Sequence, residues 1–173
     1  MNKDRQLILI VHNVRSSHNV GSMLRTCDGL GINKVFLTGY TPYPQLENDT
    51  RLPYLARRVD NQIHKTALGA EKNVPWEHKD NLWPLLNELR AQDFQISALE
   101  QSPSAVPINS YTPPPNLAII VGREVEGIED DILASVDLII EIPMKGAKES
   151  FNVSVAAAIA LYHCQNTYLS SKT

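Results

Sequence analysis

The stretch Glu141-Ile-Pro-Met-Lys-Gly-Ala-Lys-Glu-Ser-Phe-Asn-Val-Ser-Val-Ala156 connects a predicted strand to a predicted helix. The strand is the apolar triplet 138–140, which is typical of a strand buried on both faces. Pro143 ends it, because proline has no N–H to donate to a neighbouring strand. A polar loop follows. Ser150 or Asn152 can then cap an Ala-rich helix that begins near Val153.

Such a junction is where α/β sheets bind ligands, because a buried strand ends there and a helix N-terminus begins. On residue types alone, a plain strand–loop–helix connection is an equally good interpretation. The N-terminal part of the chain supports the α/β class. Residues 7–11 predict a buried strand, Asn19 can cap a helix that runs to about Leu30, and 35–37 predict a second strand. This unit implies parallel strands joined by a right-handed crossover.

The remaining elements extend this pattern into one α/β domain over residues 1–173, a mostly parallel sheet with helices on both faces. Further helices are expected at 80–92 (capped by Asp80), at 128–134 and from 153 to about 168, and further strands at 94–99, 117–121 and 138–140. We expect 40–60 to be irregular, 62–70 to form a short helix, and the Pro-rich 102–115 to be an extended loop.

Composition and charge are those of a soluble globular protein. The net charge of −3 argues mildly against a strongly basic nucleic-acid surface, although cations outnumber acids in residues 1–34. No apolar run is long enough to span a bilayer, and residues 1–5 are polar, unlike a secretory signal. Cys27 and Cys164 are too few for a disulfide framework. We therefore expect a cytoplasmic protein without a membrane partner, with both cysteines buried.

Several well-known motifs are absent. Residues 122–127 have the glycine spacing of a P-loop, but Ile128 and Glu129 replace its Lys-Ser/Thr pair. Gly29 and Gly31 follow a helix, whereas a dinucleotide fingerprint would precede one. The five histidines are scattered without the spacing of metal ligands, so we expect no metal.

Tyrosines and arginines are interleaved in residues 40–60. This composition suits base stacking and phosphate contact, while a surface segment with solvated charges is the somewhat more favoured interpretation. The residues are Tyr40, Tyr43, Arg51, Tyr54, Arg57 and Arg58.

Three polar segments follow predicted strands: 13–25, 122–127 and 142–152. The carboxyl ends of neighbouring parallel strands open into one crevice, so we expect these segments to meet. Together they resemble the SpoU (TrmH-like) branch of the SPOUT RNA 2′-O-ribose methyltransferases.

The resemblance rests on three motifs in the family's order and spacing. Asn13-Val-Arg-Ser-Ser-His-Asn-Val-Gly-Ser-Met-Leu-Arg25 is similar to the first motif, and Leu117-Ala-Ile-Ile-Val-Gly-Arg-Glu-Val-Glu-Gly-Ile128 to the second. Ile142-Pro-Met144 with Ser150-Phe-Asn-Val-Ser-Val-Ala156 is similar to the third. Arg123 stands where the family more often has Asn, and Phe151 where it more often has Leu. We expect a single domain without the separate RNA-binding domain that many relatives carry before the catalytic domain.

The resemblance implies a C-terminal trefoil knot that binds S-adenosylmethionine, largely through backbone groups. The residues implied to bind this cofactor are Leu99, Val121, Gly122, Ile142, Met144, Phe151 and Val153. Relatives are homodimers in which the first motif reaches the partner's cofactor site. We therefore expect a homodimer packed through the small-residue face of the last helix, although burial of that face within one subunit is an equal alternative on residue types. The face consists of Val153, Ala156, Ala157, Ala160 and Leu161.

The resemblance also implies methyl transfer to a ribose 2′-hydroxyl, with Arg25 as the catalytic residue. Because a guanidinium loses its proton very reluctantly, binding the adjacent phosphate and stabilising the developing alkoxide is easier for it than acting as a base. Asn19 is expected to orient Arg25, and Glu124 to hold the loop or the arginine. Ser150 and Asn152 are expected to position the ribose, with a helix cap as the alternative for Asn152. The expected RNA contacts are Arg15, Arg25, Arg123, Lys145 and Lys148.

Two alternatives belong to other functional classes. One is a knotted RNA-binding protein without catalysis, and the other is a methyltransferase that acts on a small molecule or a protein. Among RNA substrates, tRNA is favoured over rRNA, because compact chains without an appended domain are common among relatives that act on tRNA.

Overall fold

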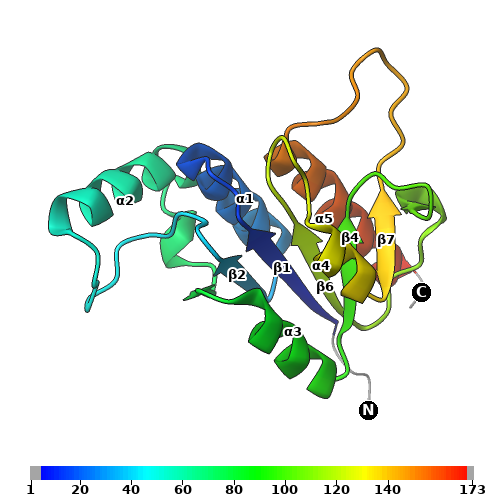
Figure 1. The fold of residues 1–173 in the computed structure, drawn as a ribbon, viewed down its shortest axis with the longest axis horizontal. Coiled ribbons are helices and arrows are strands. Elements are labelled where there is room, and N and C mark those ends of the chain that lie inside the picture. Colours follow the sequence, from blue (N-terminus) through cyan, green and yellow to red (C-terminus); the bar gives the residue numbers. More distant parts are fainter. Residues whose placement is uncertain (1–4, 171–173) are drawn as a thin grey trace.

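Seven parallel strands form one sheet in the computed structural model, which describes residues 5–170 (Figure 1). Their order is β3-β2-β1-β6-β4-β7-β5, and each neighbouring pair is parallel. The strands are β1 (Gln6–His12), β2 (Lys34–Thr38), β3 (Trp76–Lys79), β4 (Gln95–Leu99), β5 (Val106–Pro107), β6 (Asn116–Val121) and β7 (Leu138–Glu141). The predicted α/β class with a parallel sheet is confirmed.

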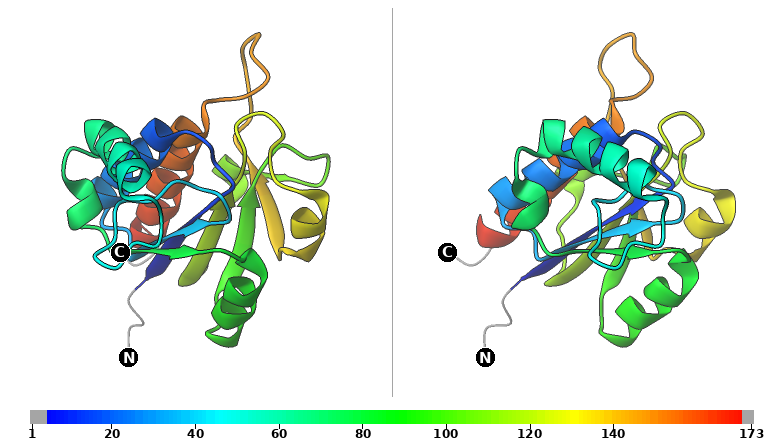
Figure 2. Two further views of the ribbon diagram at one scale, coloured as in Figure 1. Left: turned by 60° about the vertical axis from the view of Figure 1, so that its left-hand side comes forward. Right: turned by 90° about the vertical axis from the view of Figure 1, so that its left-hand side faces the viewer.

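Helices cover both faces of the sheet (Figures 1 and 2). They are α1 (Ser17–Leu30), α2 (Pro53–Ala67), α3 (Leu82–Ala91), α4 (Asp130–Ser135) and α5 (Val153–Ser170), with short 3-10 helices η1 (Ala70–Lys72) and η2 (Ile108–Ser110). α1, α2 and α5 share one hydrophobic core with Leu9, while α3 and α4 share the other with Ile10. Adjacent residues of β1 thus point to opposite cores, as the uninterrupted apolar run predicted.

Two helices have a different cap from the predicted one. Ser16 caps α1 in place of Asn19, because its Oγ accepts a hydrogen bond from the Asn19 N–H at 3.2 Å. Asn81 caps α3 in place of Asp80, since its Oδ1 accepts from the Trp83 N–H at 3.0 Å. The shift at α1 places Asn19 in the first helical turn and leaves its side chain available for other contacts.

The segment after β2 departs most from the prediction. Residues 53–60 were expected to be irregular and 62–70 to form a short helix, but α2 runs without a break from Pro53 to Ala67. Proline fits the first helical position, where no N–H partner is needed. β3 was missed because Trp76–Lys79 is a half-buried strand without an apolar run. The expected extended loop 102–115 contains the two-residue β5 and η2.

The strand order brings the three motifs to one edge of the sheet. β1, β6, β4 and β7 are consecutive neighbours, so the loops that follow them leave from adjacent carboxyl ends. The connection from β7 to α5, orange in Figure 1, rises above this edge. The trefoil knot implied by the family resemblance stays a prediction.

Candidate active site

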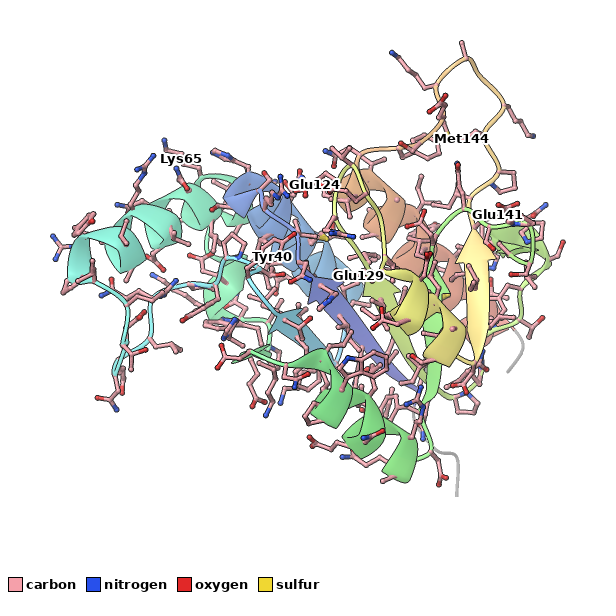
Figure 3. All side chains as sticks on the ribbon, viewed as in Figure 1. Tyr40, Lys65, Glu124, Glu129, Glu141 and Met144 are labelled. Atoms are coloured by element: carbon pink, nitrogen blue, oxygen red, sulfur yellow. The ribbon has the colours of Figure 1, made fainter. Side chains whose placement is uncertain are left out.

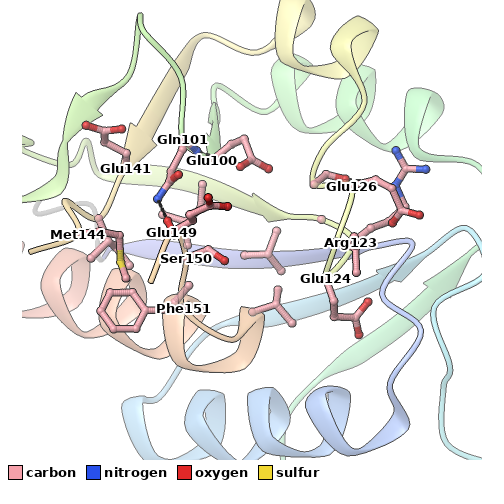
Figure 4. A pocket seen from close by; sticks show the side chains of 18 residues that line it. Glu100, Gln101, Arg123, Glu124, Glu126, Glu141, Met144, Glu149, Ser150 and Phe151 are labelled. Carbon is pink, nitrogen blue, oxygen red and sulfur yellow. Dashed lines mark hydrogen bonds between the residues drawn. The ribbon is translucent and has the colours of Figure 1, made fainter. Parts of the chain in front are cut away.

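A cavity of about 280 Å³ lies where β4, β6 and β7 end (Figure 4). All seven residues predicted to bind the cofactor line it: Leu99, Val121, Gly122, Ile142, Met144, Phe151 and Val153. Glu124 and Ser150, two of the predicted catalytic residues, line it as well. The structure therefore brings the second and third motifs together around one space.

Polar groups that were not predicted from the sequence also line this cavity. The Glu100 carboxylate accepts a hydrogen bond from the Ile128 N–H at 3.1 Å. The Gln101 side chain donates to the Glu149 carbonyl oxygen, a contact drawn in Figure 4. The loop after β4 is thereby tied to the loops after β6 and β7. The only sequence signal for Glu100 was its position directly after a predicted strand.

Two glycines allow the loop after β6 to fold tightly beside the cavity. A Cβ atom on Gly122 would lie 2.5 Å from Ile128 Cγ1 and 2.9 Å from the Gly127 carbonyl carbon. Gly127 has a φ of +71°, and a Cβ there would collide with the Glu100 carboxylate. Residues with side chains rarely adopt this φ. The close packing of this loop therefore requires both glycines.

Three side chains, one from each motif, form a chain of hydrogen bonds that we call the motif junction: Asn19, Glu124 and Asn152. Glu124 Oε1 accepts from Asn19 Nδ2 at 3.2 Å, and Asn19 Oδ1 accepts from Asn152 Nδ2 at 3.2 Å. The backbone N–H groups of Arg15 and Ser16 also donate to the Glu124 carboxylate, at 3.2 and 3.1 Å. The predicted meeting of the three segments thus has a specific structural form.

The Glu124 carboxylate lies at the N-terminus of α1, where a helix dipole favours negative charge. Partial burial raises the pKa of Glu124, but the hydrogen bonds from Arg15, Ser16 and Asn19 outweigh it and the net pKa lies below the ordinary value. Glu124 is therefore ionised at neutral pH. Through Arg15 and Ser16 it holds the loop that leads into α1, and the described residues of one chain show no contact between Glu124 and Arg25.

Asn152 uses both ends of its amide. Its Oδ1 accepts from the Ser154 N–H at 2.9 Å, so Asn152 caps α5 as the alternative interpretation predicted. Its Nδ2 donates to Asn19 and completes the motif junction. The cap and the junction fix one side chain between two helices.

Arg25 lies outside this arrangement. It is exposed on α1, does not line the cavity, and forms no hydrogen bond or ion pair with the residues that the structure describes. Asn19 was expected to orient Arg25, but its side chain bonds to Glu124 and Asn152. A single chain thus does not bring Arg25 to the cavity.

A second polar cluster, which was not predicted, connects β1 to the start of α4. Asn13 Nδ2 donates to Glu129 Oε1 at 3.0 Å, and Asn13 adopts a φ of +55°. Arg123 Nε lies 3.7 Å from the same oxygen and donates to the Gly127 carbonyl oxygen at 3.2 Å. Arg123, which was expected to contact RNA, therefore has its Nε group engaged within the protein.

His12 belongs to the same cluster. Its Nδ1 lies 2.8 Å from Thr38 Oγ1, and its Nε2 lies 3.6 Å from Glu129 Oε2. Burial lowers the pKa of His12; Glu129 and Asp131 oppose this shift and Arg123 reinforces it. The net effect is a lowered pKa, so His12 is neutral at neutral pH.

The other cations considered for RNA contact differ in whether groups of the protein itself already engage them. Lys145 and Lys148 are exposed on the β7–α5 connection, and Arg15 is exposed with one nitrogen 3.6 Å from Glu126. Arg51 is engaged internally, because its guanidinium stacks 3.7 Å from the centre of the Tyr43 ring and bonds to Asp49. The Tyr43–Arg51 pair therefore serves structure, which neither the RNA contact nor the solvated charge considered for this segment had predicted.

Helix α5 buries most of the face that was expected to form a dimer. Ala157, Ala160 and Leu161 are at most 1% exposed and belong to the core shared with α1. The opposite side leaves Tyr162 61% exposed. There an apolar groove runs between α1 and α5, lined by Thr26, Gly29, Leu30, Ala158, Ile159, Tyr162, His163, Asn166 and Thr167.

The described residues contain no group of histidine, cysteine and acidic side chains that could hold a metal ion. Within residues 5–170, no helix has both the length and the apolar character needed to cross a membrane. Cys27 and Cys164 are free and buried, and burial raises the pKa of each thiol to about 12.

The model of the SpoU rRNA methylase family matches residues 6–162. The chain belongs to this family. The expected family is therefore confirmed.

Two relatives illustrate the sequence identity between this chain and other proteins. A tRNA (guanosine(18)-2′-O)-methyltransferase of Aquifex aeolicus is 32% identical over 94% of this chain and 70% of its own length. The 23S rRNA (guanosine(2553)-2′-O)-methyltransferase RlmP of Bacillus subtilis is 29% identical over 90% of this chain. This chain spans only 56% of the length of the second relative.

Solved structures agree with the fold. The crystal structure of the Aquifex aeolicus TrmH/SpoU tRNA modifying enzyme has a TM-score of 0.78 at 26% identity and covers 98% of this chain and 80% of its own. The SpoU methyltransferase AviRb from Streptomyces viridochromogenes, in complex with the cofactor AdoMet, has a TM-score of 0.80 over 96% of this chain and 59% of its own. At 17% identity, the second likeness supports the fold alone.

Proposed function

We propose that this protein transfers a methyl group from S-adenosylmethionine to a ribose 2′-hydroxyl of RNA. The observation that carries the proposal is the motif junction, in which Glu124, Asn19 and Asn152 join the three family motifs beside one cavity. The named relatives are both RNA 2′-O-methyltransferases. Bound S-adenosylmethionine supplies an activated methyl group on a sulfonium. The protein therefore has to bind the cofactor and the RNA, align the 2′-hydroxyl with the methyl group and exclude water.

The residues around the cavity fit this cofactor. Apolar side chains of Leu99, Ile142 and Met144 offer walls for a purine ring. Gly122 lacks a side chain at a crowded point of the cavity wall, so peptide groups of this loop can approach a ligand closely. Carboxylates of Glu100 and Glu141 also line the cavity and can accept hydrogen bonds from ribose hydroxyls or an amino group.

The proposed catalytic roles follow from where the side chains lie. Arg25 is assigned to the RNA phosphate and to the negative charge that develops on the 2′-oxygen, because a guanidinium carries a fixed positive charge and several hydrogen-bond donors. Ser150 lines the cavity and is assigned to the ribose. Asn19, Glu124 and Asn152 are positioning residues that fix the rim of the site.

A homodimer is part of the proposal. Arg25 is exposed on α1 and is not among the residues that line the cavity of its own chain, so we assign the arginine at each cavity to a second chain. The apolar groove between α1 and α5 supports such pairing, since exposed apolar surface of this kind favours association.

For the RNA class, we propose tRNA ahead of rRNA. The Aquifex relative, named for tRNA, is slightly more similar than the Bacillus relative, named for rRNA, at 32% against 29% identity. The reaction at the ribose is the same for tRNA and rRNA. The two substrates differ in the RNA surface that the protein has to bind.

The test is methyl transfer by purified protein from labelled S-adenosylmethionine to bulk tRNA and, separately, to bulk rRNA. The proposal predicts label in RNA at positions that resist alkaline cleavage, because a 2′-O-methyl group removes the attacking hydroxyl. RNA binding without transfer would favour a non-catalytic RNA-binding protein. Cofactor binding without transfer to any RNA would favour a different substrate class.

A further inference from the structure

Helix α2 presents an outer face with positive charges and no carboxylate. Three cations are exposed there: Arg57, Arg58 and Lys65. None of them forms a hydrogen bond or an ion pair with the residues that the structure describes. The only acid of α2, Asp60, is half-buried and accepts a hydrogen bond from the Gln45 N–H at 2.9 Å. On a chain with net charge −3, this face is a local concentration of uncompensated positive charge.

The cations are aligned with an exposed aromatic ring. Tyr54, Arg58, Asn61 and Lys65 follow one another at spacings of four, three and four residues, which places them along one side of a helix. Tyr54 is 66% exposed. With a rise of about 1.5 Å per residue, the row is about 16 Å long. We call Tyr54, Arg57, Arg58 and Lys65 the α2 basic face.

This face lies next to the candidate active site. The Thr66 hydroxyl of α2 donates to the His18 carbonyl oxygen at 2.8 Å, one residue before Asn19 of the motif junction. Gly21 permits this approach, because a Cβ there would collide with the Ile63 carbonyl oxygen. Figure 3 places Lys65 at the end of α2 that lies beside the start of α1. A polymer bound at the cavity can therefore continue along α2.

The start of α2 is held in place by the chain before it. Arg51 donates to the carbonyl oxygens of Tyr43 and Pro44 at 3.0 and 3.2 Å, and the Tyr43 ring stacks on His78 with centroids 4.0 Å apart. These contacts use Tyr43 and Arg51 for structure and leave Tyr54 and the cations free. The face is therefore preorganised for a partner.

We propose that the α2 basic face docks the backbone of the RNA substrate and that Tyr54 stacks on an unpaired base. The inference rests on the proposed function. Phosphates are spaced along a strand and match a row of cations, and bases offer π-faces to an exposed tyrosine. A solvated helix face usually mixes charges of both signs, whereas this one carries cations only.

The test compares two double variants with the same loss of charge. Arg57→Gln/Arg58→Gln removes two cations from α2. Lys34→Gln/Lys79→Gln removes two that bind Glu77 on the α3 side of the sheet, where the Lys34 amino group lies 4.7 Å from the Phe36 ring centre. Affinity for bulk tRNA is measured over a range of salt concentrations, together with S-adenosylmethionine binding and the oligomeric state.

The α2 double variant is expected to bind bulk tRNA about tenfold more weakly near physiological salt, with the slope of log affinity against log salt reduced by about 2. The control double variant is expected to stay within about twofold of wild type. Cofactor binding and oligomeric state should be unchanged in both. Equal weakening by both variants, or none by the α2 variant, overturns the inference. A changed oligomeric state would instead make this face a contact between copies.

A second comparison isolates the stacking contact. Tyr54→Ala should weaken binding of single-stranded RNA by about tenfold, while Tyr54→Phe, which keeps the ring, should not. Equal affinity of both variants overturns the role of Tyr54. Wild-type protein that neither binds nor methylates RNA would refute the proposed function as well. If the wild-type protein transfers methyl groups normally and the α2 double variant binds RNA as well as wild type, the α2 inference is refuted and the proposed function is not.

Discussion

Asn152 Nδ2 donates a hydrogen bond of 3.2 Å to Asn19 Oδ1, although the two residues are 133 positions apart in the chain. Asn19 in turn donates to Glu124, which accepts two backbone N–H groups at the start of α1. The start of α1, the loop after β6 and the start of α5 are therefore held in one geometry beside the cavity. A change at any member should disturb the site more than the fold.

Glu124→Gln tests this expectation. Glutamine has one acceptor oxygen and adds two donors, so it cannot satisfy the three N–H groups that Glu124 accepts. We predict a loss of methyl transfer of about tenfold or more, with a stability loss of about 1 kcal/mol or less because the residue is exposed. Glu47→Gln is the matched control, since Glu47 is exposed, does not line the cavity and forms no hydrogen bond or ion pair with the residues that the structure describes. Equal activity of both variants would contradict the role of the junction.

Gly122→Ala should weaken S-adenosylmethionine binding. The new Cβ would lie 2.5 Å from Ile128 Cγ1 and 2.9 Å from backbone, so the loop beside the cavity must move. Gly146→Ala, in the loop after β7, would meet nothing within 4 Å and serves as the control. Calorimetry is expected to show at least about tenfold weaker cofactor binding for the first variant, equivalent to about 1.4 kcal/mol, and little change for the second. Unchanged cofactor binding by Gly122→Ala would contradict the assignment of this cavity to the cofactor.

Arg25→Ala should abolish methyl transfer and leave cofactor binding intact, because Arg25 is not among the residues that line the cavity. Transfer is measured with labelled cofactor and binding by calorimetry. Loss of cofactor binding in a folded variant would show that the assigned role is wrong.

Subunit mixing tests whether Arg25 acts on the partner's cavity. Arg25→Ala lacks the arginine, and Gly122→Trp should block the cofactor. A mixed dimer then has one site damaged twice and one intact, so random exchange should restore about a quarter of the wild-type activity. No recovery, with mixed dimers detected by mass, would place Arg25 and the cofactor in the same chain.

The buried His12 predicts a pH dependence of stability. Its pKa is below the ordinary 6.5 because of burial, so below about pH 6.5 the unfolded chain takes up a proton that the folded chain does not. Stability should therefore fall as pH drops from about 7.5 to 5.5, by at most about 1.4 kcal/mol per pH unit from this residue. His12→Asn should show a smaller drop in melting temperature over this range. An equal drop would contradict the assignment.

The meeting of the three polar segments could be predicted because each follows a strand directly. The seven residues that the family resemblance implied for the cofactor all line the cavity, and each belongs to a segment at the carboxyl end of β4, β6 or β7 or to the start of α5. The cap of α1 was misplaced by three residues because Ser16 and Asn19 are both good capping types.

Contacts between distant side chains could not be predicted. Arg123 is engaged by Glu129 and the Gly127 carbonyl oxygen, a pairing that depends on how the loop after β6 turns at two glycines. The position of Arg25 away from the cavity depends on how α1 is oriented on the sheet. The unbroken α2 was missed because prolines and tyrosines in 40–54 indicated a loop up to and beyond the true helix start.

Methyl transfer to a ribose 2′-hydroxyl requires one particular oxygen atom of the substrate, and removing that atom tests the proposed reaction. The methylated nucleotide is first mapped in RNA treated with the protein, and an RNA carrying the 2′-deoxy form at that one position is then compared with the unmodified RNA. We expect transfer to the unmodified RNA and none to the 2′-deoxy RNA, with both RNAs bound equally. Continued transfer to the 2′-deoxy RNA would contradict it.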